Sequence, residues 1–387
     1  MPLDFIGLQE DISAYVKDAQ HYQELIEKQT QAAIDALQRF SSNPQVLRAH
    51  GEKAHKRVAL PTEEDPAGSI ACSAPAADHS IVSVDGSQIV PDRHTPPYVA
   101  LVNTGIIRFP AGQSPLKPVT LSKFYKYEDL FDEANLISED MVNLDRDVME
   151  MKYLNEYSPK SEQPVIALRD GMLELYHEPR TEKWYRQKVE EYSGYLNDLK
   201  SKDVITAGYV DKPRSRSLIT LIDSSLEQSG RAQDGITQFP HITDTHVFSL
   251  LLEPAQRSAI FETRVPGEPS SQEQEQKPVF YFFYLNVSQT AKPWVVRVEI
   301  PEWVACDKEH DNERDNEMVN ILHLALLQQC AIMGSKPYPY CLHRAHETAV
   351  VHPHEKAVLE KMINAGLCQT DKGIEEVSHK QSLKDQT

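Results

Sequence analysis

Two short apolar runs, each leading into an aspartate that a glycine follows, constrain the fold of this chain more than any other feature. Residues 81–84 precede Asp85, and residues 165–168 precede Asp170 with one residue between. β-branched residues favour strands, and a glycine lets the backbone turn sharply beside the carboxylate. On local spacing alone, Asp85 and its glycine are typical of an ordinary turn after a strand. Repetition of the pattern at Asp170 predicts two strands whose carboxylates meet at one edge of a sheet.

The segments that follow these runs predict a sheet of mixed direction. After Asp85, β-rich runs at 98–102 and 104–109 indicate an antiparallel meander. After Asp170, a helical pattern at 184–199 leads to another strand at 204–210, which is the spacing of a right-handed strand–helix–strand crossover. We therefore expect an α/β fold in which part of the sheet is parallel.

Helical periodicity begins near the N-terminus. Residues 12–40 carry apolar side chains at steps of three and four, which predicts one amphipathic helix or two. Most such helices pack against a core, and contact with another copy of the chain is the alternative. The remaining patterns indicate helices at 138–157, 217–226, 311–333 and 354–367, and a hairpin built from 279–285 and 294–300.

These patterns predict the organisation of the chain. We expect a helical extension over residues 1–60, a linker over 61–78 and a main domain over 79–367. A polar loop insertion at 265–277 interrupts the main domain, and residues 368–387 form a flexible tail.

Composition excludes some classes of protein. The formal net charge is −18, so a general nucleic-acid coat protein, which would be basic, is excluded, whereas an enzyme with a local basic groove is not. No apolar run approaches the ~20 residues of a membrane span, and the first residues lack the basic start of a signal peptide. The five cysteines form no C-x-x-C pair, which argues against a cysteine-based zinc site. We expect a cytoplasmic protein without a membrane segment.

Converging carboxylates give the clearest chemical signal. Asp85 and Asp170 would repel each other at one sheet edge, and a divalent cation is the usual remedy. Oxygen ligands with one imidazole suit Mg²⁺ or Mn²⁺ better than zinc. A helix against the sheet could add Glu150, and a histidine from a late helix could complete the set. Two ions about 3.5–4 Å apart clamp both oxygens of a phosphodiester displacement. The set therefore indicates a metal-dependent phosphoryl-transfer site of ribonuclease-H type.

Four motifs lie around these acids. They are Val84-Asp85-Gly86-Ser87-Gln88-Ile89 with Pro91-Asp92-Arg93-His94, Leu168-Arg169-Asp170-Gly171-Met172-Leu173, Gly208-Tyr209-Val210, and Tyr338-Pro339 with Leu342, Ala345 and His346. In order and approximate spacing over residues 80 to 355, they resemble the signature of a known family, the NurA nucleases. The resemblance implies a ribonuclease-H-like mixed sheet flanked by helices. It also implies a Mn²⁺-dependent single-strand endonuclease and 5′-to-3′ exonuclease. The family forms ring-like dimers that act with the hexameric HerA translocase in DNA end resection.

The resemblance implies roles for individual residues. The family's two metal-binding aspartates fall on Asp85 and Asp170, its late histidine on His346 and its active-site tyrosine on Tyr209. Its glutamate falls on Glu150, which shares a helical spacing with Arg146; Asp147 and Glu156 are the alternatives. The first ~70 residues, the loop near 272–276 and the tail have no counterpart in the family pattern.

Other interpretations stay open at this point. Arg93, Arg169 and Arg344 adjoin the site residues, so they could grip phosphates or neutralise the carboxylates. His94 fits a turn and His343 an exposed helical position. A non-catalytic scaffold of a DNA-translocase complex with a relic site is the main alternative function, and a phosphohydrolase of small molecules is a third.

Overall fold

The structure is a computed structural model that describes residues 5, 7–73, 78–92, 98–132, 135–175, 183–232, 235–266, 278–306 and 317–368. Arg93, His94, most of the expected loop at 265–277 and the tail beyond 368 lie outside these residues. The chain divides into two compact units. Unit 1 comprises residues 1–74, 210–327 and 334–337, and unit 2 comprises 75–209, 328–333 and 338–387. The domain boundaries expected from sequence stay a prediction.

Unit 2 is built on five strands of mixed direction. They are β3 (Ser80–Ile89), β4 (Leu101–Phe109), β5 (Val119–Phe124), β8 (Val165–Asp170) and β9 (Ile205–Val210), and they pair in the order β5-β4-β3-β8-β9. The first three strands form an antiparallel meander, and β8 and β9 extend it as parallel strands. An antiparallel meander followed by parallel crossover strands, in the order 3-2-1-4-5, is the ribonuclease-H arrangement. The predicted fold class is confirmed.

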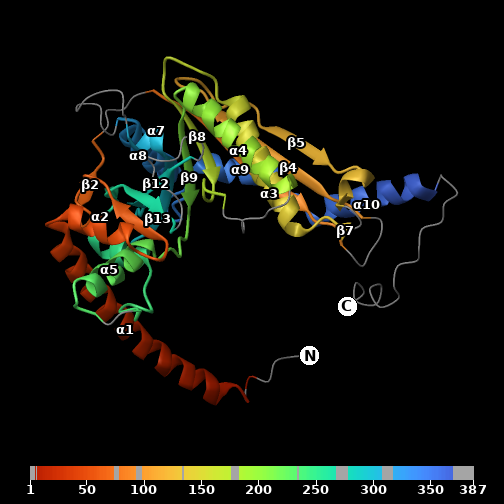
Figure 1. Ribbon diagram of the computed structural model, residues 1–387. Helices are drawn as coiled ribbons and strands as arrows, with labels where there is room; N and C mark the ends of the chain where they lie inside the picture. Colours follow the sequence, from red (N-terminus) through yellow and green to blue (C-terminus); the bar gives the residue numbers. More distant parts are fainter. Residues whose placement is uncertain are drawn as a thin grey trace. The chain divides into compact units, whose positions relative to one another are not determined.

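Helices cover both faces of this sheet. In Figure 1, α3 (Glu139–Tyr157) and α4 (Lys183–Ser201) lie side by side in front of the strands, and α9 (Tyr340–Ala349) lies behind them. Ser138 caps α3 by accepting a hydrogen bond from the Met141 N–H, and Glu139 and Asp140 in the first turn suit the helix dipole. Because α4 joins the parallel strands β8 and β9, the expected strand–helix–strand unit is confirmed.

Shorter elements complete unit 2. They are the 3₁₀ turn η1 (Tyr127–Leu130), the two-stranded pair β6 (Phe131–Asp132) and β7 (Asn135–Leu136), and α10 (Pro353–Cys368). A buried cluster that includes Val102, Tyr125, Val142 and Met149 holds α3 and the η1 region against β4. Helix α8 (Glu317–Ile332) has residues in both units.

The strands of unit 1 pair with one another in antiparallel fashion. Strands β1 (Val58–Pro61), β11 (Phe261–Arg264), β12 (Phe280–Asn286) and β13 (Val295–Pro301) pair in that order, and β10 (Gln256–Ser258) pairs with β12 and with β2 (Ser69–Ala71). The predicted β12–β13 hairpin is confirmed. The helices of this unit are α1 (Gln9–Ser41), α2 (Pro44–Glu52), α5 (Ser217–Gln228), α6 (Asp244–Leu251) and the short α7 (Glu302–Ala305).

The core of unit 1 joins segments that are distant in sequence. Ala33 and Leu37 of α1 pack in one buried cluster with Ile219 of α5, Phe248 of α6 and Phe282 of β12. The second half of the N-terminal helix is therefore part of a core. No helix among the described residues is both long and apolar enough to cross a membrane.

Two local expectations differ from the structure. The predicted break between strands at residues 103–104 is absent, because β4 runs unbroken from Leu101 to Phe109. The predicted turn after Asp85 is also absent: β3 continues to Ile89, held by β4 along its whole length. The second Asp-Gly pair does end its strand, since β8 stops at Asp170 and Gly171 has a φ of +87°.

Candidate active site

Asp85 and Asp170 lie on neighbouring parallel strands. The register pairs Val84 of β3 with Arg169 of β8 and stops there, so the next residue on each strand is an aspartate. Because side chains alternate along a strand, both aspartates point to the same face of the sheet. Asp85 is buried and Asp170 is half-buried. The register places the two carboxylates side by side, at the end of β8 but within β3, so only one of the two strands ends at its aspartate as predicted.

The environment of Asp170 is set by burial and by its acidic neighbour. Burial first, and then the negative charge of Asp85, raise the pKa of the Asp170 carboxyl. A hydrogen bond from the Tyr338 side chain, the His346 imidazole and the Gly171 N–H act in the opposite direction. The two carboxylates are therefore close enough to repel each other.

His346 completes this group from a distant part of the chain. It lies in the last turn of α9, and its Nδ1 is 2.7 Å from Oδ2 of Asp85. Its side chain is 60% exposed, whereas that of Asp85 is 12% exposed. The imidazole therefore bridges a buried carboxylate and solvent.

A glycine lets α9 approach closely enough for this contact. Gly105 of β4 pairs with Asp85, and a Cβ atom there would lie 2.5 Å from the carbonyl oxygen of Ala345 and 2.6 Å from the backbone nitrogen of Ala349. Real Cβ atoms do not come so near to backbone, so only glycine allows α9 to lie on β4. The sequence alone predicts no such role for Gly105, because it lies next to the expected break between two strands.

Small polar side chains of the sheet then fix α9 in place. Ser83 Oγ donates to the carbonyl oxygen of Cys341 at 2.8 Å, near the start of the helix. At its end, Ser87 Oγ and Asn103 Nδ2 both donate to the carbonyl oxygen of Ala349, at 2.5 Å and 2.7 Å. The two bonds to Ala349 satisfy a carbonyl that the C-terminal end of a helix leaves unpaired. By fixing α9 against β3 and β4, these bonds hold His346 in its position next to Asp85.

Glu150 lies on the other face of β3. Gly86 points to that face, and a Cβ atom there would lie 2.6 Å from Oε1 of Glu150 and 2.6 Å from Cγ of Arg146. Glu150 Oε2 accepts a hydrogen bond from Nε of Arg169 at 2.7 Å, and its Oε1 lies 3.5 Å from Nε of Arg146. Burial raises the pKa of Glu150 to about 7, although the charge of Arg169 opposes this rise. Gly86 thus makes room for the Glu150 side chain beside the strand.

The alternatives for the third acid lie in different surroundings. Asp147 is buried and shares the guanidinium of Arg169 with Glu150. Glu156 is half-exposed and lies 3.7 Å from the ammonium of Lys152. Asp147 therefore lies near the same strands as Glu150, and Glu156 lies at the surface.

Tyr209 is fully buried on the strand next to Asp170. Tyr209 lies on β9, where it pairs in register with Asp170 of β8. Its hydroxyl is 3.8 Å from Sγ of Cys330. Its ring meets the ring of Tyr338 edge to face at 5.5 Å. Tyr338 in turn hydrogen-bonds Asp170. Tyr338, which belongs to the late sequence motif but had no predicted role, thus contacts a carboxylate of the site.

A comparison with protein-family models identifies the family of this chain. The model of the NurA domain matches residues 79–351, which is more than half of the chain. The chain belongs to the NurA domain family. All the candidate site residues lie inside the matched range. A search of curated proteins finds no match.

Solved structures give a weaker likeness to this NurA member. A crystal structure of NurA bound to dAMP and manganese is 11% identical, with a TM-score of 0.38, and the match covers 94% of this chain and 98% of that one. The structure of Aquifex aeolicus Argonaute is 11% identical, with a TM-score of 0.30. The match covers 70% of this chain but only 28% of that Argonaute. TM-scores this low support no argument from either structure.

The NurA site has the donor chemistry of a divalent-cation site. Among the described residues, no three His, Cys, Asp or Glu side chains gather closely enough to hold a metal ion. Asp85, Asp170 and His346 nevertheless bring oxygen donors and one imidazole to the same sheet face, a set that suits Mn²⁺ or Mg²⁺. The charge of Asp85 raises the pKa of Asp170, and a cation between them would relieve that repulsion.

The arginines and the second histidine near the site have partners. Arg169 is buried against Glu150 and Asp147, so its guanidinium neutralises carboxylates. Arg344 on the outer face of α9 lies 2.5 Å from Oε2 of Glu347, and His343 lies 3.5 Å from Oε1 of the same residue. Of the two expected uses for these arginines, the structure shows neutralisation for Arg169.

Proposed function

We propose that this NurA member is a metal-dependent DNA nuclease, a two-metal phosphodiesterase that uses Mn²⁺ or Mg²⁺. The observation that supports it best is the meeting of Asp85, Asp170 and His346 on one sheet face, at the point where parallel pairing of β3 and β8 ends. Ligands of open α/β sheets bind at such carboxyl ends of strands. Glu150, the fourth ligand expected from the sequence, lies on the opposite face of β3 against Arg169 and Arg146, so we propose that the other three residues hold the cation and that Glu150 acts from its own face.

The proposed chemistry follows from the charges of these side chains. A divalent cation held there would neutralise the phosphate and acidify the attacking water. When Asp85 is ionised it accepts the Nδ1–H of His346, which leaves Nε2 as the acceptor of that ring. Nε2 is then suited to hold a ligand or to take a proton at the exposed side of the site.

Glu150 and Tyr209 act from less exposed positions in this proposal. Glu150 adjoins β3 at Gly86, one residue after Asp85, and Arg169 holds its carboxylate there. Tyr209 supports the ring of Tyr338, which hydrogen-bonds Asp170. Tyr209 is thus a positioning residue in this scheme, because it is fully buried.

Family membership supports the finer parts of the proposal. We propose single-strand endonuclease and 5′-to-3′ exonuclease activity on DNA, in end resection and repair. The partners would be a second copy of this chain and a HerA-type hexameric ATPase, in the cytoplasm. The alternative, a non-catalytic scaffold of a translocase complex, draws support from the engagement of Glu150 with Arg169 and Arg146.

A nuclease assay on the full chain tests the proposal. Single-stranded DNA labelled at the 5′ or 3′ end is incubated with Mn²⁺, Mg²⁺ or EDTA, and the two labels report polarity. We expect cleavage with Mn²⁺, none with EDTA, and a loss of roughly 10²–10⁴-fold in Asp85→Asn and Asp170→Asn. Glu347→Gln, an exposed change next to His346, should retain full activity.

Calorimetric titration with Mn²⁺ separates the two functions. The nuclease should bind Mn²⁺, and Asp170→Asn should weaken that binding. If the wild-type chain neither binds Mn²⁺ nor cleaves DNA, alone or with a HerA-type ATPase, the nuclease proposal is wrong and the scaffold function is supported.

A further inference from the structure

The N-terminal helix carries a heptad pattern in its first half. Apolar or small residues recur at alternating steps of four and three from Leu8 through Ile12, Tyr15, Ala19 and Tyr22 to Ile26. Polar Gln29 interrupts the pattern, and the buried second half of the helix has a wider apolar stripe that includes Ile34 and Leu37. An apolar repeat that averages 3.5 residues is typical of a coiled-coil seam, whereas the wider stripe is typical of a helix that covers a core.

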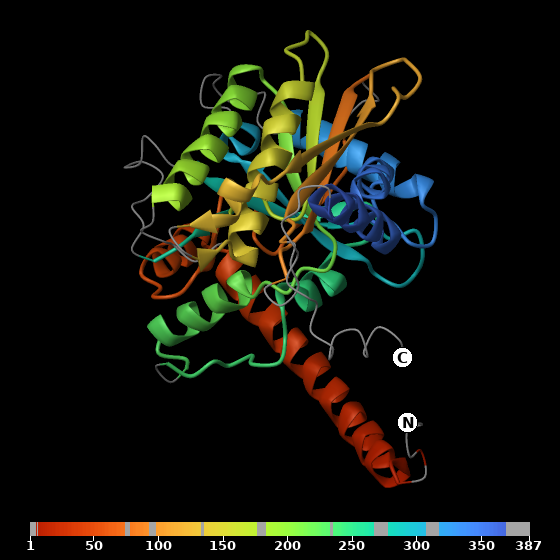
Figure 2. The ribbon, with the colours of Figure 1, turned by 90° about the vertical axis from the view of Figure 1, so that its right-hand side faces the viewer.

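The two halves of this helix have different surroundings. Ala33 and Ala36 are buried in the core of unit 1, and Ile26 and Phe40 pack against it. Every described residue from Gly7 to Glu24 is exposed instead. Figure 2 shows the red helix α1 running unbroken through both halves. The core therefore covers only the second half of the helix.

Large apolar side chains stand exposed along the first half. Tyr15 is 74% exposed, Ile12 52%, Val16 49% and Leu8 38%. Tyr22, at the junction, contacts His241 through a 3.0 Å hydrogen bond and an edge-to-face ring contact, and it is still 45% exposed. Leaving this surface in water forfeits the main favourable term of folding and association.

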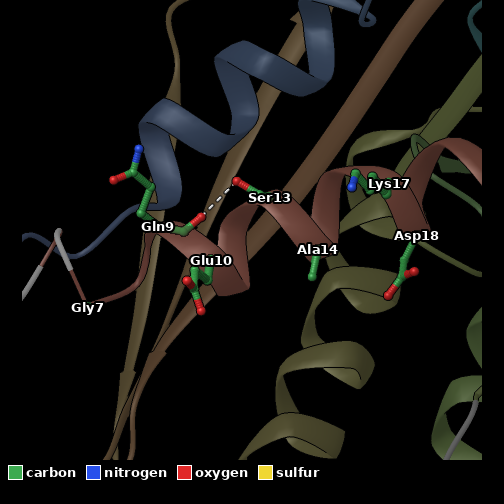
Figure 3. A pocket seen from close by; sticks show the side chains of 7 residues that line it. All are labelled: Gly7, Gln9, Glu10, Ser13, Ala14, Lys17 and Asp18. Atoms are coloured by element: carbon green, nitrogen blue, oxygen red, sulfur yellow. Dashed lines mark hydrogen bonds between the residues drawn. The ribbon is translucent and has the colours of Figure 1, made fainter.

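The same turns carry mostly polar residues beside and opposite the seam. Figure 3 shows Gln9, Glu10, Ser13, Ala14, Lys17 and Asp18 lining a surface hollow, with Ser13 Oγ donating to the carbonyl oxygen of Gln9 at 2.8 Å. Their charged groups suit solvent. The helix is thus amphipathic where it is exposed, and only its seam calls for a partner.

We propose that the seam from Leu8 to Tyr22 pairs with the same seam of a second copy, as a parallel two-stranded coiled coil. A heptad seam fits a helix of the same repeat, and a second copy supplies one. Small Ala19 at a central core position allows close approach between the bulkier Tyr15 and Tyr22 layers. This inference specifies the surface of the homodimer in the proposed function and does not depend on nuclease activity.

Charge favours the parallel arrangement. Asp11 and Asp18 flank the seam at equivalent heptad positions. In an antiparallel pair these aspartates would face each other across the interface. In a parallel pair Asp11 faces Val16, and Asp18 faces Gln23, so the acids are kept apart.

The size of the seam predicts a modest affinity. Two heptads on each helix bury less than the roughly 1,200 Å² at which specific stable interfaces begin. Such a contact belongs to the transient class unless another surface adds to it. The experiment must therefore capture a weak, specifically oriented pair.

Disulfide trapping tests the orientation and the surface together. The full chain carries Cys72→Ser, Cys306→Ser and Cys368→Ser, and Ala19→Cys is introduced at a core position of the seam. Core positions of a parallel pair lie within the Cα distance of about 4.4–6.8 Å that a disulfide requires. Mild oxidation should give a linked dimer on a non-reducing gel, and dilution should reduce its yield.

The matched control is Ala14→Cys in the same background, on the polar side shown in Figure 3. We expect at least a tenfold lower yield of linked dimer from this variant. Tyr15→Asp added to Ala19→Cys should abolish linkage while nuclease activity stays at the level of the parent. Equal linkage at residues 14 and 19, or none at 19, overturns the proposal and leaves the nuclease proposal untouched.

Discussion

The two faces of β3 treat buried acids in opposite ways. On the α3 face, Glu150 and Asp147 share Arg169, and Asp145 lies against Lys123 and Lys188. On the α9 face, the partners of Asp85 and Asp170 are an imidazole, a tyrosine hydroxyl and a backbone N–H. Among the residues that the structure describes, the guanidinium and ammonium partners of these acids lie on the α3 face.

This contrast between the two faces indicates which acids would gain from a bound cation. A buried carboxylate with a guanidinium needs no further cation, whereas two adjacent carboxylates with one imidazole remain an acidic site. The pKa of Asp145 is lowered and that of Asp170 is raised, in keeping with this contrast. Four substitutions test the contrast, each on a different group.

Removal of Arg169 should have the largest effect. Arg169→Met would leave Glu150 and Asp147 buried without their main cation, and breaking a buried pair in this way costs about 3–5 kcal/mol. Chemical denaturation should show this loss in the free energy of unfolding. Arg344→Ala, which removes an exposed partner of Glu347, should cost less than about 1 kcal/mol. Equal losses in the two variants contradict the assigned role of Arg169.

Displacement of α9 should come next. Gly105→Ala would force the backbone of Ala345 and Ala349 away from β4, at a cost of about 1–3 kcal/mol for overpacking. It should also lower kcat by moving His346 from Asp85. Gly194→Ala in α4 is the control, since a Cβ there meets nothing within 4 Å and should stabilise the helix by about 0.5–1 kcal/mol.

The pH dependence of the free energy of unfolding tests the contribution of the Asp145 carboxylate. Burial alone would raise the pKa of this carboxyl, but hydrogen bonds and charges from Lys123, Tyr125 and Lys188 lower it below the usual value. A lowered pKa means that the unfolded chain binds the proton more tightly. The stabilisation is therefore present above the unfolded pKa and is lost as the pH falls through the folded value.

Asp145→Asn should reduce the free energy of unfolding at pH 7 by about 1–3 kcal/mol. Below the ordinary aspartate range the difference from wild type should shrink. Urea denaturation at a series of pH values measures both effects. A difference that stays constant down to pH 2 shows that the carboxylate charge is not what stabilises this cluster.

The smallest effect is expected at Asp170, with the opposite sign. Asp170→Asn removes a half-buried charge that Asp85 repels, so metal-free protein should be unchanged or more stable, by up to about 1 kcal/mol. Thermal unfolding in EDTA measures this change. A large destabilisation would mean that Asp170 is a structural residue held by Tyr338.

Much of the fold followed from periodicity and spacing. Local patterns in the sequence predict three parts of the fold directly: the β8–α4–β9 crossover, the β12–β13 hairpin and helix α3. Family resemblance predicted the Asp85, Asp170 and His346 set, which the structure brings together. The face occupied by Glu150 could not be predicted, because it depends on which side of β3 receives α3.

Residues without a chemical signature of their own were missed. Gly105 and Asn103 looked like a strand break, because the pattern does not show that a helix from residue 340 onward would lie on them. Tyr338 is one of 16 tyrosines, and only the tertiary fold places it beside Asp170. The sequence predicts that α1 is amphipathic. It does not predict that the core covers only the part of the helix after about residue 24.

The contact between Asp85 and His346 joins residues 261 positions apart. During synthesis, the strands that carry the two aspartates can leave the ribosome while most of α9 remains to be made. The proposed site therefore lacks its imidazole until residue 346 has been added and α9 has closed onto β4. A nascent or prematurely terminated chain would carry the acids without the histidine. The order of translation itself thus delays completion of the proposed site.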